Sequence, residues 1–78
     1  MIETKLKEIL LTVLELDPSE YSEDLSTETN EKWDSIKHLL LMSTLEEEFQ
    51  LNFNDDDLLN LTSYQNIKNR LEEAANAK

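Results

Sequence analysis

The 78-residue chain contains no glycine and no cysteine, and it has one proline and one histidine. The missing glycine excludes phosphate-cradling Gly-rich loops, a dinucleotide-binding fingerprint and the turn of an EF-hand. It also disfavours tight β-hairpins, because their turns need residues with positive φ. The missing cysteine excludes a disulfide framework and a thiolate zinc site. His38 alone cannot build a histidine-rich metal site.

Basic residues are also scarce, since 7 Lys and Arg face 18 Asp and Glu, which leaves a net charge of −11. Nucleic-acid phosphates and anionic membrane surfaces repel such a chain. No apolar run approaches the length of a membrane span, and the first residues do not resemble a signal peptide. We therefore expect a cytoplasmic monomer that binds no nucleic acid and no membrane, and a partner with a basic docking surface.

Apolar residues recur at helical spacing through most of the chain. The pattern predicts helices over residues 2–15, 35–49, 55–60 and 63–75, with Pro18 ending the first segment. The fold class is therefore all-α, a small bundle of three longer helices and one short helix. A long acidic loop, residues 17–34, joins the first two helices, and we expect Tyr21 and Leu25 to tie it to the core.

The helix over residues 35–49 is the most apolar and should lie at the centre of the bundle. At 100° per residue, one broad buried face is expected, made of Leu39, Leu41, Met42, Leu45 and Phe49. Asn54 is expected to cap the short helix, and Thr62 with Gln65 to form a capping box for the last one. The chain end, residues 76–78, should fray.

The inventory of side chains argues against catalysis. A Ser-His-Asp triad needs groups that converge from separate elements, whereas Ser35 and His38 share one helix. We expect His38 to be a packed or half-packed helix residue and not a base. The acids at 46–48 diverge by 100° per residue and cannot form one metal site, and those at 55–57 suit the positive end of a helix dipole. No catalytic residue and no metal site are predicted.

Asp34 and Ser35 stand at the start of the central helix, directly after the acidic loop. Asp and Ser are common N-caps, and capping alone explains most such pairs. A serine at this place also has its hydroxyl beside unpaired backbone N–H groups at the positive end of the helix dipole, where a phosphodiester is accommodated. Both interpretations stay open at this point.

The outer face of the same helix carries a second feature. Ile36, Leu40 and Glu47 fall at about 100°, 140° and 120°, nearly opposite the predicted buried face. Two apolar side chains one turn apart, beside an exposed serine and rimmed by acids, indicate a docking surface. The alternative is a fully buried central helix, which would hide Leu40.

The sequence resembles the acyl carrier protein family, which includes peptidyl carrier domains. The resemblance rests on Trp33-Asp34-Ser35-Ile36 and on the helix ending Leu45-Glu46-Glu47-Glu48-Phe49. It implies one carrier domain, residues 1–78, that catalyses nothing itself. A phosphopantetheinyl transferase, using coenzyme A and Mg²⁺, would attach 4′-phosphopantetheine to Ser35, with Asp34 presenting the site. The arm would carry acyl or aminoacyl thioesters between enzymes, including a loading ligase or synthase.

The chain departs from carriers of bulk fatty-acid synthesis at three positions. Lys32 replaces a common glycine, and Lys37 and Leu40 replace common acids. Because Lys37 would repel a basic partner, we expect a specialised pathway, such as secondary-metabolite, polysaccharide or aminoacyl metabolism. If the core opens for an acyl chain, Met42, Leu45 and His38 would line the pocket, although we expect ordinary core packing.

Two other functions compete with the carrier hypothesis. The first is an acidic interaction module without a prosthetic group, in which Ser35 serves only as a helix cap. The second is a divalent-cation sensor built from residues 55–57 and the acidic loop. Modification by a transferase discriminates the first from a carrier, and a saturable response to Ca²⁺ would support the second.

Overall fold

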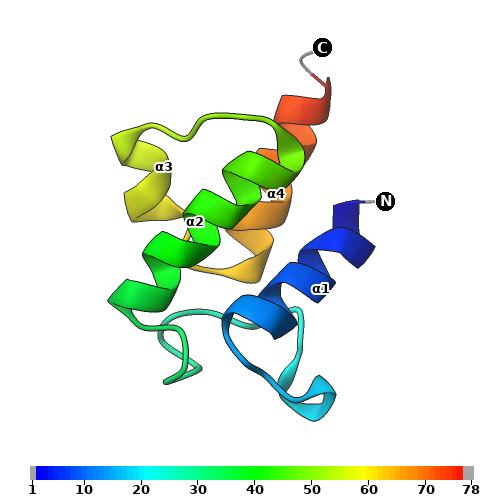
Figure 1. The fold of residues 1–78 in the computed structure, drawn as a ribbon, viewed down its shortest axis with the longest axis vertical. Helices are drawn as coiled ribbons and strands as arrows, with labels where there is room; N and C mark the ends of the chain where they lie inside the picture. Colours follow the sequence, from blue (N-terminus) through cyan, green and yellow to red (C-terminus); the bar gives the residue numbers. More distant parts are fainter. Residues whose placement is uncertain (1, 77–78) are drawn as a thin grey trace.

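Helical spacing in the sequence becomes four α-helices in the computed structural model, which describes residues 2–76 (Figure 1). The helices are α1 (Ile2–Val13), α2 (Ser35–Phe49), α3 (Asp55–Asn60) and α4 (Tyr64–Asn76), with a 3₁₀ turn η1 (Pro18–Glu20) in the first loop. The described part of the chain holds no named strand, and its one isolated antiparallel bridge joins Ser26 to Ser63. The all-α bundle of three longer helices and one short helix is confirmed.

Helix ends follow local chemistry. Asn54 caps α3 as predicted, because its Oδ1 accepts from the Asp57 amide at 2.8 Å and the Asp57 carboxylate accepts from the Asn54 amide. The first helix ends at Val13, earlier than expected, because Glu15 adopts the left-handed conformation with φ of 55°. The Leu16 amide then donates to the Leu11 carbonyl at 3.0 Å, which ends the helix several residues before Pro18.

The predicted cap of α4 is wrong. Ser63, not Thr62, caps this helix, since the Ser63 hydroxyl accepts from the Asn66 amide at 3.2 Å. The Gln65 side chain does not reach back to the cap and instead donates to the Glu23 carbonyl at 3.4 Å. Asn76 is the last residue of α4, and the expected fraying of residues 77–78 lies outside the described residues.

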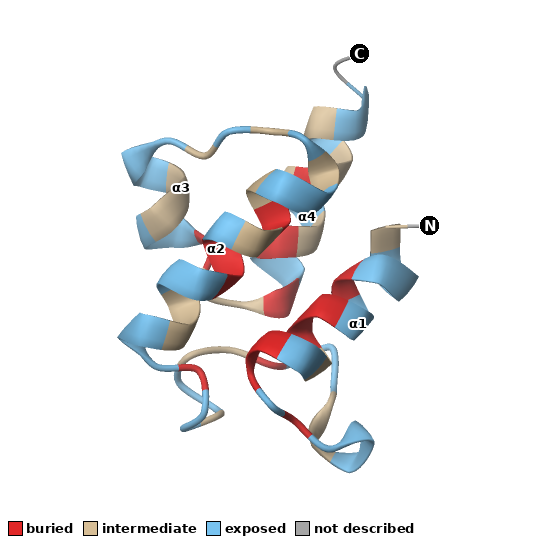
Figure 2. Ribbon diagram, in the orientation of Figure 1, coloured by how far each residue is buried: buried red, intermediate tan, exposed pale blue. Residues whose placement is uncertain are grey.

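The core lies where α1 contacts α2 and α4, and Figure 2 shows the buried residues along the facing sides of these three helices. The loop and the α3–α4 junction complete it. The buried residues are Leu6, Ile9, Leu10, Val13, Leu14, Leu16, Leu25, Trp33, Leu41, Met42, Leu45, Leu61, Tyr64, Ile67 and Leu71. All of the described buried residues are apolar or aromatic, and their side chains bring two polar groups into the core, the indole N–H of Trp33 and the hydroxyl of Tyr64.

One residue of the predicted core face of α2 is misplaced. Leu39 is 62% exposed, whereas Leu41, Met42 and Leu45 are buried and Phe49 packs against them. The buried arc of α2 is narrower than predicted, because α1 packs against one side of α2 and the six-residue α3 leaves Leu39 exposed. Leu39 lies beyond the edge of that arc.

The first loop is firmly attached to the bundle. Leu25 is buried as expected, and the Tyr21 ring packs edge-on against Tyr64 with 5.8 Å between centroids. Backbone bonds join the loop to the start of α4, since the Tyr64 amide bonds the Leu25 carbonyl at 2.8 Å and the Thr27 amide bonds the Thr62 carbonyl at 2.9 Å. The loop therefore holds a defined position beside the start of α2.

Candidate functional site

Ser35 is the first residue of α2 and is exposed. Its position follows from Asp34, which adopts an extended conformation and caps the helix. The Asp34 Oδ1 accepts from the Lys37 amide at 2.8 Å, and the Asp34 carbonyl accepts from the His38 amide at 2.8 Å. Asp34 is thus the cap, and the Ser35 hydroxyl is not needed for capping.

Free hydrogen-bonding groups surround this hydroxyl. Within the described residues, the Ser35 Oγ makes no hydrogen bond, whereas the hydroxyls of Ser22, Ser26 and Ser63 all accept from backbone amides. The amides of Ser35 and Ile36 likewise have no acceptor in the described part of the chain. Two free N–H groups at a helix start attract an anion such as a phosphodiester. A phosphate-linked group on Ser35 fits this arrangement.

His38 joins three segments near Ser35. The Trp33 Nε1–H donates to His38 Nδ1 at 3.1 Å, and His38 Nε2 lies 2.8 Å from the Leu58 carbonyl oxygen. Because Nδ1 accepts, the ring is neutral and Nε2 carries the proton that it donates to Leu58. His38 is half-buried, which agrees with the expected packed or half-packed helix residue, and its ring connects the buried Trp33 and α2 to α3.

An open groove of about 570 Å³ begins at Ser35 and runs between α2 and α3. Its walls are mainly apolar, and they include Trp33, His38, Leu39, Leu58 and Leu59. Thr27 and Thr62 add hydroxyls at the loop side. A second groove of similar volume between α1 and α2 shares no residue with the site and is lined largely by charged and hydroxyl side chains.

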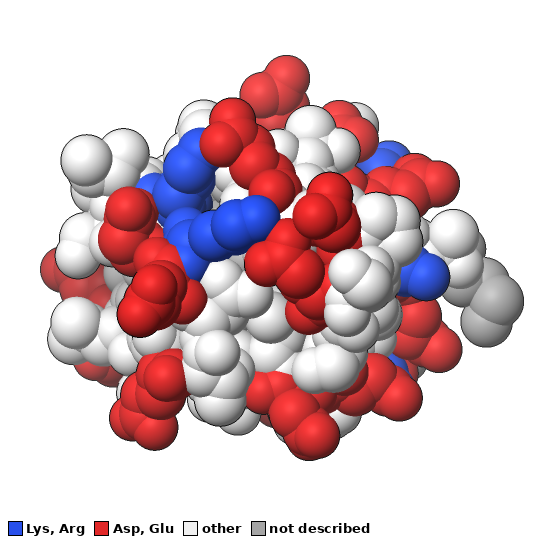
Figure 3. Space-filling view, turned by 90° about the horizontal axis from the view of Figure 1, so that it is seen from below, with Lys and Arg blue, Asp and Glu red and all other residues white. Residues whose placement is uncertain are grey.

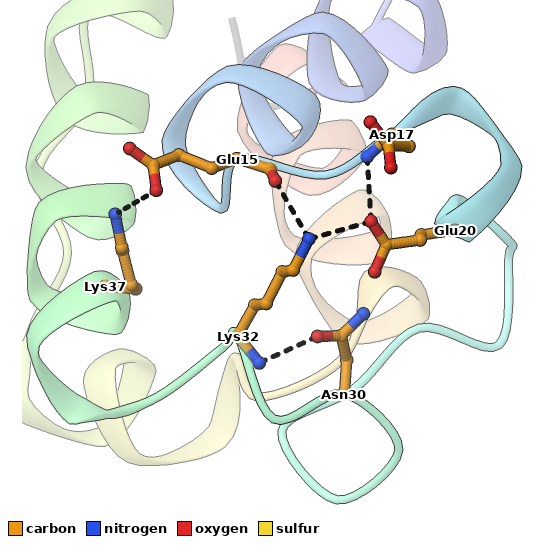
Figure 4. A network of polar contacts seen from close by, with 6 residues as sticks. All are labelled: Glu15, Asp17, Glu20, Asn30, Lys32 and Lys37. Atoms are coloured by element: carbon orange, nitrogen blue, oxygen red, sulfur yellow. Dashed lines mark hydrogen bonds and ion pairs between the residues drawn. The ribbon is translucent and has the colours of Figure 1, made fainter.

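Two lysines flank the site and face the first loop (Figure 4). Lys32 Nζ donates to Glu20 Oε1 at 2.8 Å and to the Glu15 carbonyl at 3.2 Å, and Lys37 Nζ lies 3.6 Å from Glu15 Oε2. The Asp17 amide bonds the same Glu20 oxygen at 2.9 Å. This amide bond, and then Lys32, lower the pKa of Glu20, and the bond to Glu20 raises the pKa of Lys32.

The outer face of α2 is uncovered. Ile36 is 78% exposed, Leu40 is 51% exposed and Glu47 is exposed, so the alternative in which a buried helix hides Leu40 is wrong. Sequence reasoning missed two neighbours, Leu39 and Leu59, the latter 76% exposed on α3. Their signal was weak: Leu39 lies at the edge of the predicted apolar arc, and α3 is too short to define a face.

Half of the acids in the two acidic runs, residues 46–48 and 55–57, have partners within the bundle. Glu46 accepts from the Phe53 amide at 2.7 Å, Glu48 pairs with Lys5 at 3.7 Å and Asp57 pairs with Arg70 at 3.3 Å. Over residues 2–76, no three His, Cys, Asp or Glu side chains gather closely enough to hold a metal ion. In the same range, no helix has the length and apolar character needed to cross a membrane.

Comparison with known proteins agrees with this geometry. Residues 4–71 match the family model described as phosphopantetheine attachment site. A search of curated proteins found no matching relative. Members of this family hold 4′-phosphopantetheine covalently and act as carriers that interact with a transferase and with biosynthetic enzymes. Since the match spans most of the chain, this protein belongs to the phosphopantetheine-attachment family of carrier proteins.

Proposed function

We propose that Ser35 is the residue that bears 4′-phosphopantetheine, and that residues 1–78 act as one carrier domain for acyl or aminoacyl groups. When attached, the group supplies a thiol that this cysteine-free chain lacks, and that thiol holds its cargo as a thioester. The chain itself contributes the attachment hydroxyl, the anion-binding helix start and the surfaces that enzymes recognise. It performs no catalysis of its own.

The observation that carries the proposal is the unengaged hydroxyl of Ser35 next to two unengaged amides. Asp34 occupies the capping position and takes the Lys37 amide, so Ser35 is left free to react. During attachment the Ser35 Oγ forms a bond to phosphorus, and the phosphoanhydride bond of coenzyme A breaks. Adenosine 3′,5′-bisphosphate leaves, and the hydroxyl proton passes to a base of the transferase. Asp34 would help present the site to the transferase and its Mg²⁺.

Partner enzymes are proposed to bind the outer face of α2, through Ile36, Leu40 and Glu47. The exposure of Ile36 and Leu40 supports this assignment, because large apolar side chains next to a reactive group favour contact with another protein. A specialised pathway is supported by Lys32 and Lys37, which replace residues common in carriers of bulk fatty-acid synthesis and are held by Glu20 and Glu15.

The proposal is tested by intact-protein mass spectrometry before and after incubation with a broad-specificity phosphopantetheinyl transferase, coenzyme A and Mg²⁺. The wild-type chain should gain the mass of one phosphopantetheine group, and Ser35→Ala should gain none. Ser43→Ala is the matched control, since Ser43 is an exposed serine of the same helix whose hydroxyl makes no bond within the described residues.

Circular dichroism should show that Ser35→Ala is as helical as the wild-type chain, because the cap is Asp34. Modification of Ser35→Ala at the wild-type rate would place the attachment elsewhere. Failure of the wild-type chain to react, while a control carrier does react, would overturn the proposal and favour the acidic interaction module.

A further inference from the structure

The exposed side of α2 and α3 carries large apolar side chains, and the exposed acids of α3, Asp55 and Asp56, lie in the first turn of that helix. Four large apolar side chains there are more than half exposed, and we call them the apolar surface: Ile36, Leu39, Leu40 and Leu59. Two of them, Leu39 and Leu59, line the groove that begins at Ser35. Exposure of this much apolar surface around one groove is typical of a protein contact.

The charges of α2 contribute little to this surface. Lys37 pairs with Glu15, Glu46 binds the Phe53 amide and Glu48 pairs with Lys5. Glu47 is the one charged residue of α2 without an ion pair or side-chain hydrogen bond in the described range. The helix by itself therefore provides weak electrostatic attraction for a basic partner.

The first loop also carries unpaired negative charge. Between η1 and the cap residue Asp34, four acids are exposed and none of them has an ion pair within residues 2–76; we call them the loop acids: Glu23, Asp24, Glu28 and Glu31. Figure 3, which views the loop end of the molecule, shows acidic side chains spread across this face and bordering its few basic ones.

The loop that carries these acids reaches the groove beside the apolar surface. Thr27, within the loop, lines the same groove as Leu39 and Leu59. The loop is also held in place, since Thr27 and Leu25 bond the backbone at Thr62 and Tyr64, and the Gln65 side chain bonds the Glu23 carbonyl. Charges fixed beside an apolar contact area steer a complementary partner without a cost of ordering the loop on binding.

We infer that partner enzymes bind this carrier through two separate surfaces, one apolar and one acidic. An apolar area of the enzyme binds the apolar surface of α2 and α3, and a group of Lys or Arg side chains beside it binds the loop acids, while α2 contributes few of the ionic contacts. The occupant is an enzyme surface with an apolar centre and a basic flank facing the loop. This inference rests on the proposed function, because the enzymes in question are those that act at Ser35.

The test measures steady-state modification of the apo chain by a phosphopantetheinyl transferase at saturating coenzyme A, over about 20–300 mM NaCl. The loop variant combines Glu23→Gln, Asp24→Asn, Glu28→Gln and Glu31→Gln. Its KM should rise about tenfold at low salt, as expected when several exposed charge pairs are lost together, and should lose most of its salt dependence. Its kcat should stay within about twofold of the wild-type value.

A matched control removes four negative charges elsewhere, on α1 and α4, with Glu3→Gln, Glu8→Gln, Glu72→Gln and Glu73→Gln. Because it changes the net charge equally, it separates a local contact from a general charge effect, and its KM should change less than about twofold. Leu39→Gln and Leu59→Gln should raise KM while leaving the salt dependence of the wild-type chain unchanged.

Three outcomes count against the inference. A loop variant with wild-type KM and salt dependence overturns it, and so does an equal effect of the α1 and α4 control. Unchanged KM in both Leu39→Gln and Leu59→Gln would show that the enzyme does not contact the groove. The groove would then be assigned to the phosphopantetheine arm, which the apo chain does not carry. In all three cases Ser35 is still modified and the proposed function stands; only the absence of modification overturns the proposed function.

Discussion

Two residues with a Cβ adopt the backbone conformation that glycine usually adopts at the end of a helix. Glu15 and Gln50 adopt the left-handed conformation at the ends of α1 and α2, with φ of 55° and 53°. Glycine is the usual residue there, because a Cβ crowds the backbone at positive φ. The chain accepts this cost at both helix ends.

The strain at Gln50 leads to the first prediction. Gln50→Gly should raise the free energy of unfolding by about 0.5–1 kcal/mol. Removal of the Cβ relieves its steric cost at positive φ, and this gain outweighs the entropy that glycine adds to the unfolded chain. Urea unfolding followed by circular dichroism measures the change. Gln50→Ala, which keeps the Cβ, is the control and should give no such gain; equal stability of the two variants would show that the conformation is not strained.

Glu20 and Lys32 give a prediction about protonation. The pKa of Glu20 is lowered from 4.5, first by the Asp17 amide and then by Lys32. A lowered pKa means that the ionised Glu20 stabilises the fold above pH 4.5 and that this contribution is lost as pH falls through the lowered value. An NMR titration should find the Glu20 pKa higher in Lys32→Met but still below 4.5, because the amide bond remains.

A Glu20 pKa in Lys32→Met that matches the wild-type value would show that the ion pair is not formed in solution. The Lys37→Met variant serves as the control, since Lys37 pairs with Glu15 and does not contribute to the pKa shift of Glu20. Its Glu20 should titrate as in the wild-type chain.

At the scale of elements, caps and side-chain bonds decide how helices begin and meet. Helices α2 and α3 span the ranges expected from the sequence, because their caps act within three residues: Asp34 on Lys37 and Asn54 on Asp57. The start of α4 was wrongly predicted because Ser63 and Thr62 are neighbouring cap candidates. The Thr62 carbonyl is instead engaged by the Thr27 amide of the distant loop.

The position of this cap can be tested by mutation. Ser63→Ala should lower the free energy of unfolding by about 1 kcal/mol, because the Asn66 amide loses its acceptor. Thr62→Ala should cost less, since the bond from Thr27 uses the Thr62 backbone and survives the change. Thermal or urea unfolding compares the two variants. A larger loss for Thr62→Ala would restore the capping box first expected from the sequence.

His38 supports the contact between α2 and α3, which forms the groove. In His38→Leu the buried Trp33 Nε1–H loses its acceptor and the Leu58 carbonyl its donor, so the free energy of unfolding should fall by about 1–3 kcal/mol. His38→Gln, whose amide offers both an acceptor and a donor, should lose less. The fluorescence of Trp33, the sole tryptophan, should shift in the first variant. Wild-type stability of His38→Leu would mean that these bonds are not maintained.

At the scale of the whole molecule, charge is unbalanced over a small body. The described residues span 34 × 26 × 19 Å, and the chain has a net charge of −11. The screening length is about 30 Å at 0.01 M salt and about 10 Å at 0.1 M. At low salt the acids repel one another across the whole molecule, whereas at 0.1 M only neighbours interact.

The melting temperature should therefore rise between about 0.01 M and 0.2 M NaCl. Thermal unfolding followed by circular dichroism measures it. The loop variant without its four acids should melt higher at low salt and respond less to added salt, because it starts with less repulsion. A melting temperature that is independent of salt in the wild-type chain would show that repulsion does not limit its stability.

The sequence by itself determined the features that depend on neighbours along the chain. Periodic leucines define the helices, and Asp34 places Ser35 at an exposed helix start, because a cap acts on amides within one turn. Only the tertiary structure decided which surfaces stay open. Leu39 is exposed because α3 is too short to cover it. Lys32 pairs with Glu20, and His38 bonds both Trp33 and the Leu58 carbonyl. These outcomes depend on which distant segments lie side by side, and no local pattern contains that information.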